Sequence, residues 1–202
     1  MNELILASNS PRRREILSRF EIPFSVITSP LEEVFNGDPP AVQAVRLSRE
    51  KIEALIKARP GLSSRLILGA DTCIDLDGKI IGKPANPDEA RSILQAFSGR
   101  THLVVTALTL YNGEKGIYTG RTDTAQVKFT DLSEDFIDWY LSTDEWKGAA
   151  GGYRIQEKGT LLIDSIIGDF YTIMGLPIRL FYGMLASQDS RYNTGKTNFP
   201  PF

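Results

Sequence analysis

Two long strand patterns joined by an Asn-Gly dipeptide constrain the fold of this chain more than any other feature of its sequence. Residues 101–111 and 116–129 have the pattern of long strands, and Asn112-Gly113 between them is the strongest short-range signal of a β-hairpin. A shorter hairpin is predicted for residues 72–76 and 79–81, which Asp77-Gly78 joins. The two strands of a hairpin run antiparallel, so a sheet that contains these segments is antiparallel in part.

Helical and strand patterns alternate through the rest of the chain. Helices are predicted at residues 11–20, 41–58, 86–97, 133–142 and 177–186 from apolar periodicity and from their flanking residues. Short strands are predicted at residues 4–7, 24–28, 66–70 and 161–166. We expect the buried strand at 66–70 to end at Asp71-Thr72. The alternation, together with the hairpins, predicts an α/β fold built on a mixed sheet.

The composition excludes several classes of protein. The 202 residues carry 23 Lys and Arg against 25 Asp and Glu, a net charge of −2, whereas proteins that coat nucleic acid are strongly basic. The single cysteine, Cys73, excludes an internal disulfide and a multi-cysteine zinc site. No apolar run is long enough to span a bilayer, and the first residues do not resemble a signal peptide. We therefore expect a cytoplasmic protein without a nucleic-acid or membrane partner.

The first candidate site is the turn between the strand at 4–7 and the first predicted helix. Ser8, Ser10, Arg12 and Arg13 lie in this turn or just inside the helix. Free N–H groups at a helix N-terminus attract anions, and arginine adds paired hydrogen bonds to phosphate. Because arginines at this position oppose the helix dipole, we interpret the turn as a phosphate-binding site. The alternative is a solvated basic turn.

The second candidate is Asp71, at the predicted end of a buried strand. Open α/β sheets place catalytic and metal-binding acids at such strand ends. Together with Glu33 from the acidic segment 30–40, Asp71 could hold a divalent cation on a triphosphate, or it could act as a base. Lys51 and Lys83 are candidate phosphate ligands if they converge on Asp71. The alternatives are a turn-capping aspartate and two solvated lysines.

The third candidate is the run of small residues at 148–152 and the amide that follows it. Small residues permit close approach of the backbone to a ligand, and Gln156 can read the edge of a base with its paired donor and acceptor. The alternative is a flexible loop. We interpret Cys73 and His102 as structural, since the sequence shows no base with a partner for a thiol nucleophile.

These segments together resemble the Maf family of Maf-like proteins, first named as septum formation inhibitors. The resemblance runs in order from about residue 4 to residue 186, so it covers nearly the whole chain. Each motif is weak by itself, whereas eight in register are specific. The matching blocks are residues 6–13, 32–33, 48–51, 68–72, 82–84, 94–99 with His102, 152–156 and 175–177.

The resemblance implies a nucleoside triphosphate pyrophosphatase, which cleaves between the α- and β-phosphates with a divalent metal cation, Mg²⁺ or Mn²⁺. It also implies a fold with an elongated, mixed central sheet flanked by helices and with a central nucleotide cleft, similar to inosine-triphosphate pyrophosphatases. We expect a single domain over residues 1–186 and a polar C-terminal tail over residues 187–202.

The family's functional positions are carried over residue by residue. Asp71 matches the proton acceptor. Arg12, Thr72 and Gln156 match the positions that set base preference in members acting on dTTP and UTP. The other polar positions of the family's cleft match Ser8, Arg13, Glu33, Lys51 and Lys83.

Two other functions stay open at this point. The 7-methyl-GTP branch of the family lacks the matching arginine and glutamine, so Arg12 and Gln156 favour the dTTP/UTP branch. A regulator of cell division that binds nucleotide without hydrolysing it would need the cleft but not the acidic and basic groups around Asp71. The sequence leaves a homodimer open as well.

Overall fold

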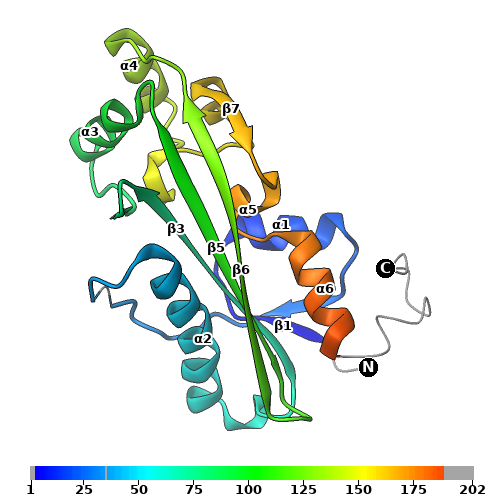
Figure 1. The fold of residues 1–202 in the computed structure, drawn as a ribbon. Helices are drawn as coiled ribbons and strands as arrows, with labels where there is room; N and C mark the ends of the chain where they lie inside the picture. Colours follow the sequence, from blue (N-terminus) through cyan, green and yellow to red (C-terminus); the bar gives the residue numbers. More distant parts are fainter. Residues whose placement is uncertain (1–2, 35, 189–202) are drawn as a thin grey trace.

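A single mixed sheet forms the centre of the molecule. The computed structural model describes residues 3–34 and 36–188, and in this part of the chain the sheet has seven strands in the order β2-β1-β3-β5-β6-β7, with β4 paired to β3 (Figure 1). The strands are β1 Leu4–Leu6, β2 Phe24–Val26, β3 Leu66–Leu76, β4 Lys79–Ile81, β5 Thr101–Asn112, β6 Ile117–Phe129 and β7 Ile163–Ile167. The predicted mixed α/β fold is therefore confirmed.

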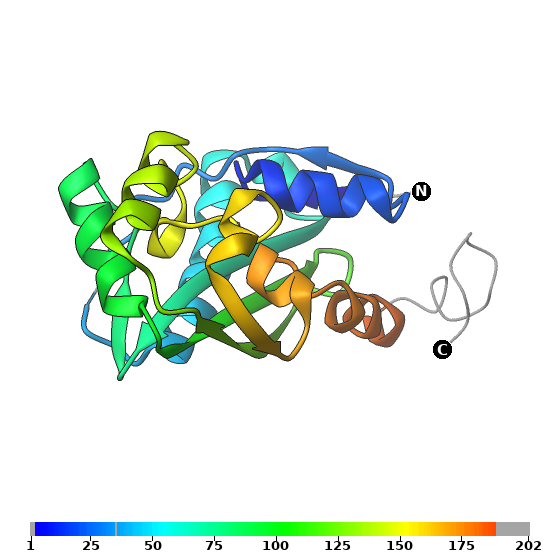
Figure 2. The same ribbon diagram turned by 90° about the horizontal axis from the view of Figure 1, so that it is seen from above.

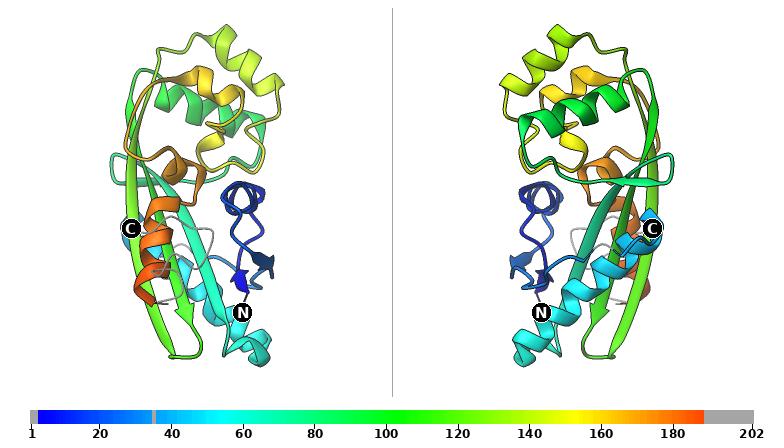
Figure 3. Two further views of the ribbon diagram at one scale, coloured as in Figure 1. Left: turned by 90° about the vertical axis from the view of Figure 1, so that its right-hand side faces the viewer. Right: turned by 90° about the vertical axis from the view of Figure 1, so that its left-hand side faces the viewer.

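Helices cover both faces of this sheet. They are α1 Pro11–Arg19, α2 Pro40–Ala58, α3 Pro87–Phe97, α4 Glu134–Ser142, α5 Phe170–Met174 and α6 Ile178–Gln188, with short 3-10 turns at Pro60–Leu62, Ala150–Gly152 and Lys158–Leu162. In Figure 1, α2 and α6 lie on opposite sides of the long strands. Figure 2 shows α3 and α4 at one end of the molecule and α6 at the other, and Figure 3 shows that the molecule is elongated along the strands.

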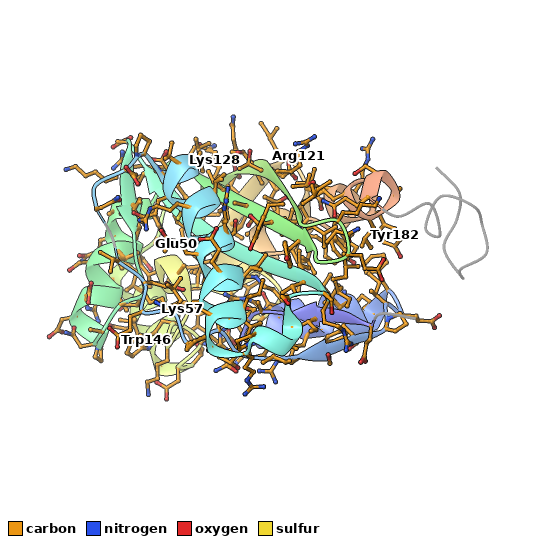
Figure 4. The ribbon with its side chains drawn as sticks, turned by 90° about the horizontal axis from the view of Figure 1, so that it is seen from below. Glu50, Lys57, Arg121, Lys128, Trp146 and Tyr182 are labelled. Carbon is orange, nitrogen blue, oxygen red and sulfur yellow. The ribbon has the colours of Figure 1, made fainter. Side chains whose placement is uncertain are left out.

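The apolar core is divided by the sheet. The larger cluster contains Leu17 of α1, Leu94 of α3 and Phe181 of α6, all fully buried. On the other face, Ile52 and Leu55 of α2 pack in a separate, smaller cluster. The outer side of α2 carries charged residues, of which Glu50 and Lys57 are labelled in Figure 4. No helix in the described part of the chain is long and apolar enough to cross a membrane.

The strand that carries Asp71 is longer than predicted. β3 runs without a break from Leu66 to Leu76, so Asp71 lies inside the strand and the prediction that it ends there is wrong. The reason is that β5 pairs with β3 along one edge, from Leu66 opposite Asn112 to Asp75 opposite Leu103. The other edge has two partners in succession, β1 and then β4. The two separate predicted strands, at 66–70 and 72–76, correspond to the parts of β3 beside these two partners.

The connection between the two longest strands also differs from the prediction. Asn112 pairs with Ile117, so the loop comprises residues 113–116, one residue later than the predicted 112–115, and Asn112 belongs to β5. Gly116 takes the left-handed conformation, with φ of 66°. Gly113 instead allows close approach, because a Cβ at this position would lie 2.3 Å from the carbonyl oxygen of Ser63.

Other boundaries differ by a few residues. The predicted helix start at Pro11 is confirmed. Asn86 and Ser133, predicted as first helical residues, are instead N-cap residues, and their helices start one residue later, at Pro87 and Glu134. β7 begins at Ile163 because a 3-10 turn occupies the preceding residues. Helix α5 was not predicted. Helix α6 includes the first two residues of the predicted tail at 187–202, and the rest of that tail lies outside the described residues. The single-domain organisation over residues 1–186 stays a prediction.

An aromatic cluster around His102 is part of the main core. The imidazole is 1% exposed and stacks on Phe97 with 4.2 Å between ring centroids. Its Nε2 lies 2.9 Å from the hydroxyl oxygen of Tyr153. Burial lowers the pKa of His102 to about 4. The predicted structural role of this residue agrees with its place in the core.

The burial of His102 predicts acid sensitivity between pH 6.5 and pH 4. In that range the unfolded imidazole binds a proton and the folded one does not, so the stabilisation is complete above pH 6.5 and is lost as the pH falls. The loss should be on the order of 3 kcal/mol. Because the chain has one histidine, an NMR titration reads this pKa directly. An imidazole that titrates near pH 6.5 in the folded protein would contradict the prediction, and His102→Gln should remove the loss from denaturation curves.

Gly69 on β3 should not tolerate a methyl group. A Cβ at this position would lie 2.0 Å from the carbonyl oxygen of Ser48 and 2.9 Å from Cγ1 of Ile52, both on α2. Gly69→Ala should therefore lower the free energy of unfolding by about 1–3 kcal/mol or more. Gly61→Ala is the matched control, since nothing lies within 4 Å of a Cβ there. Urea denaturation curves that coincide for the two variants would show that α2 does not depend on the close approach.

Candidate active site

The site lies where one edge of β3 has no partner strand. On this edge β1 pairs with Ile67 and Leu68, and β4 pairs from Ile74 onward, which leaves Gly69–Cys73 uncovered by any strand among the described residues. A cleft of about 830 Å³ opens there. Its walls include all ten residues predicted for the site, namely Ser8, Ser10, Arg12, Arg13, Glu33, Lys51, Asp71, Thr72, Lys83 and Gln156.

The turn between β1 and α1 forms one wall. The backbone N–H of Ser10 donates to Oγ of Ser8 at 3.2 Å, and α1 starts at Pro11. Ser10 is the N-cap residue, but its side chain accepts no capping hydrogen bond from the described residues. The first N–H groups of α1 therefore keep the anion-binding character expected of a free helix N-terminus.

Arg13 is buried and hydrogen-bonded to protein groups. Its Nε donates to the carbonyl oxygen of Gly175 at 2.8 Å, Nη1 to Oγ of Ser8 at 3.0 Å and Nη2 to Oγ1 of Thr72 at 3.1 Å. Burial lowers the pKa of Arg13, and the Asp71 carboxylate opposes this shift. With three of its five N–H groups used in this way, Arg13 ties the turn, β3 and the loop after α5 together.

Arg12, unlike Arg13, forms no hydrogen bond to a protein group in the described part of the chain. Its buried Nε has no hydrogen-bond partner among the described residues. Burial and, secondly, the charge of Arg154 lower the pKa of Arg12. A buried guanidinium N–H without a partner is costly, and an anion in the cleft would supply the missing acceptor.

Lys51 contacts both carboxylates of the site, those of Asp71 and Glu33. From α2, its Nζ contacts Oδ1 of Asp71 at 2.5 Å, Oε1 of Glu33 at 2.8 Å and the carbonyl oxygen of Ala70 at 3.3 Å. Both Lys51 and Asp71 are buried. Burial raises the pKa of Glu33, but attraction to Lys51 outweighs it, so the pKa lies below its ordinary value. The expected convergence of Lys51, Glu33 and Asp71 is present.

Cys73 lies beside this cluster without the properties of a nucleophile. Its Sγ contacts Oδ2 of Asp71 at 3.6 Å. Burial and the negative charge of Asp71 raise the pKa of Cys73 to about 12. A thiol with such a pKa stays protonated near neutral pH and is a poor nucleophile, as the sequence analysis expected.

Lys83 and Gln156 reach the cleft from separate segments. Lys83 follows β4 and is exposed, and Gln156 lies between two 3-10 turns and is half-buried. Both line the cleft. Neither side chain has a hydrogen bond to another residue in the described part of the chain, so both polar heads are available to a ligand.

Within the run of small residues, Gly151 packs against protein, whereas Gly148 and Ala150 line the cleft. Gly151 takes φ of 67°, and a Cβ there would lie 2.5 Å from Cδ1 of Ile74. Its N–H donates to the carbonyl oxygen of Gly82 at 2.8 Å. The expectation that small residues bring this backbone against the ligand is therefore corrected at Gly151, which instead fixes the segment to the β3–β4 hairpin.

Three charged residues of the cleft, Glu15, Arg154 and Glu157, were not predicted. Arg154 and Glu157 line the cleft and form an ion pair at 3.6 Å, and Arg154 also donates to the carbonyl oxygen of Lys147 at 2.9 Å. Their position on either side of Gln156 was the available signal, because a segment that brings one side chain into a cleft also brings its neighbours.

Oxygen ligands for a hard cation are present but few. The described residues contain no group of three or more Asp, Glu, His or Cys side chains that could hold a metal ion. Asp71 and Glu33 converge on a single ammonium group, which lies closest to one oxygen of each. Carboxylate oxygens suit Mg²⁺ or Mn²⁺, which commonly take their other ligands from phosphates and water.

Comparison with known proteins gives consistent results. A model of the family described as Maf-like protein matches residues 3–188. A Pyrococcus furiosus protein named dTTP/UTP pyrophosphatase is 44% identical over 181 residues, which cover 88% of this chain and 91% of that protein. A Fusobacterium nucleatum protein of the same name is 43% identical over 178 residues, with the same coverage of both chains.

One solved structure shows a weaker likeness. A HAM1 protein from Coxiella burnetii has a TM-score of 0.44 and 18% identity, over 64% of this chain and 73% of that one. Similarity at this level assigns neither fold nor function. The family model, by contrast, spans almost the entire described chain, and the two relatives share over two fifths of their residues with it. The chain belongs to the Maf family.

Proposed function

We propose that this protein is a nucleoside triphosphate pyrophosphatase that hydrolyses dTTP and UTP to the nucleoside monophosphate and pyrophosphate. The observation that carries the proposal is the Lys51–Asp71–Glu33 cluster at the uncovered edge of β3, with Arg12 and Lys83 beside it in the same cleft. The names of the Pyrococcus and Fusobacterium relatives support the reaction and the two substrates. The cellular role would be the removal of unwanted nucleotides from the pool.

The phosphates bind to the cations that have no protein partner. Arg12 and Lys83 form no ion pair or side-chain hydrogen bond within the described residues, whereas Arg13 and Lys51 are engaged by protein groups. The N-terminus of α1 adds free N–H groups and the positive end of its dipole. Charge that develops on the pyrophosphate leaving group is stabilised by these fixed donors.

Asp71 and Glu33 are the residues that would hold a divalent cation, Mg²⁺ or Mn²⁺. When bound, such a cation neutralises phosphate charge and polarises the α-phosphate. Lys51 holds both carboxylates in place, since it contacts one oxygen of each.

Asp71 also accepts the proton of the attacking water in this proposal. The water oxygen bonds to the α-phosphorus, the bond from that phosphorus to the bridging oxygen breaks, and the water proton passes to the carboxylate. The buried position of Asp71 and its fixed contact with Lys51 hold the acceptor in one orientation. Whether Asp71 serves as base, as metal ligand or as both is decided by the variants below.

Base preference rests on Arg12, Thr72 and Gln156. Gln156 offers an amide donor and a carbonyl acceptor, which match the O4 acceptor and N3–H donor of uracil and thymine. Cytosine reverses this pattern, so CTP should be disfavoured. The side chain of Gln156 lines the cleft without a protein hydrogen bond among the described residues, as such a role requires.

We also propose a cytoplasmic location, on the ground of the single cysteine and the near-neutral charge. A homodimer stays a prediction, to be measured by light scattering on the purified chain.

Asp71→Asn should abolish pyrophosphate release with little change in fold. The substitution keeps the shape of the side chain and removes its charge, so a loss of about 10²-fold or more in kcat is expected for a proton acceptor or metal ligand. Asp75→Asn is the matched control, because Asp75 lies on the same strand and does not line the cleft. Full turnover by folded Asp71→Asn would exclude Asp71 from the mechanism. A loss that excess Mn²⁺ restores would assign metal binding, and one that no metal restores would assign the base.

A nucleotide panel tests the substrate. With Mg²⁺ or Mn²⁺, dTTP and UTP should show higher kcat/KM than CTP, GTP and 7-methyl-GTP. Gln156→Glu replaces the amide donor by an acceptor and should lower kcat/KM for both favoured substrates by about 10-fold to 100-fold. Gln126→Glu, on the exposed side of β6, should leave it unchanged. Faster release from CTP, GTP or 7-methyl-GTP would overturn the substrate assignment, and no release from any nucleotide would overturn the reaction.

A further inference from the structure

A row of polar side chains crosses the sheet behind the cleft. Thr72 on β3 is paired with Thr106 on β5, and Thr106 is paired with Asp123 on β6. Residues directly opposite one another in a sheet share a face. Helix α5 lies over this row through Thr172, whose hydroxyl donates to Oδ2 of Asp123 at 2.5 Å. Thr106 and Thr172 are both fully buried.

The direction of each hydrogen bond in this row is fixed. Thr106 Oγ1 donates to the carbonyl oxygen of Thr172 at 2.7 Å, and this uses the only proton of its hydroxyl. The contact of 2.9 Å between the hydroxyls of Thr72 and Thr106 must then have Thr72 as the donor. On its other side, Thr72 accepts from Nη2 of Arg13 at 3.1 Å.

The hydroxyl of Thr72 therefore has no proton left for a ligand. A hydroxyl has one donor and two acceptor positions; Thr106 takes the donor and Arg13 one acceptor position. What remains is one lone pair, on a side chain that is half-buried in the cleft wall. A ligand group that meets Thr72 must be an N–H or O–H donor, and a bare acceptor there would be repelled.

We infer that Thr106 is a positioning residue for base preference. It makes Thr72 an acceptor only, so Thr72 adds a second acceptor beside the Gln156 carbonyl for the N3–H of uracil or thymine and repels the N3 lone pair of cytosine. The inference rests on the proposed function. Thymine and uracil carry a hydrogen on N3, whereas cytosine presents a lone pair there. Sugar hydroxyls are donors too, but UTP and CTP have the same sugar, so the ratio of their rates reports on the base alone.

Thr106→Val tests this role. Valine has nearly the shape of threonine but accepts no hydrogen bond, so the proton of Thr72 becomes free to turn into the cleft and donate to N3 of cytosine. The ratio of kcat/KM for UTP to that for CTP should fall about tenfold, the effect of one hydrogen bond, mainly through a lower KM for CTP. Thr106→Ser restores the hydroxyl and should restore the ratio. Thr106→Ala is the second variant if valine prevents folding.

Thr109→Val is the matched control. Thr109 is also a buried threonine of β5, but its hydroxyl contacts Oγ of Ser48 at 2.7 Å, on the face covered by α2. This variant also loses a buried hydrogen bond and should keep the wild-type ratio. A reduced ratio in Thr109→Val as well would assign the effect to general loosening of the strand and overturn the inference.

Binding separates this inference from the proposed reaction. Dissociation constants for the α,β-methylene analogues of UTP and CTP can be measured without turnover. Suppose that wild-type protein releases no pyrophosphate while Thr106→Val lowers the Kd for the CTP analogue, relative to that for the UTP analogue, about tenfold. In that case the proposed reaction fails and the role of Thr106 stands. Folded Thr106→Val or Thr106→Ala with the wild-type preference in both binding and turnover would overturn the role of Thr106.

Discussion

The rest of the site depends on Gly69–Cys73 of β3, five residues that pair with β5 on one edge and have no strand on the other edge among the described residues. A sheet edge exposes backbone carbonyl and N–H groups that need partners. The carbonyl oxygen of Leu68 bonds to Ala7 of the β1 side, so the carbonyl of Ala70, two residues on, points to the same edge. Lys51 donates to it. A side chain from α2 thus replaces a strand partner and lies against Asp71 as a result.

This arrangement requires α2 to lie unusually close to the sheet. Gly69 provides the space, because a side chain there would collide with the carbonyl of Ser48. One turn along α2 from Ser48, Lys51 then reaches the Ala70 carbonyl and both carboxylates. The helix contact and the charge cluster therefore depend on each other. Gly69 allows α2 to lie close to β3, and at this distance Lys51 of α2 reaches the carboxylates.

Pairing divides the four cations predicted for the cleft into two kinds. Arg13 and Lys51 are buried and satisfied by protein oxygens, so their charges hold the turn and the carboxylates in place. Arg12 and Lys83 have no such partners among the described residues and keep their hydrogen-bonding capacity for a ligand. The sequence showed the residue types but could not separate the kinds, because pairing depends on segments as distant in sequence as Arg13 and Gly175.

Local signals accounted for much of the fold, and long-range contacts for what was missed. Apolar periodicity and flanking residues predicted the starts of α3 and α4 to within one residue, at Asn86 and Ser133, which the structure shows to be N-caps. Helix α5 has five residues, too few to show periodicity, and it forms between a capping Asp169 and the left-handed Gly175.

Thr172 of α5 completes the polar row behind the cleft. In sequence, threonines of a strand indicate only β-propensity, so Thr106 gave no sign of this role. Because a buried polar network is stable only when every member is satisfied, the row that the short helix closes also fixes which atom Thr72 presents to the cleft.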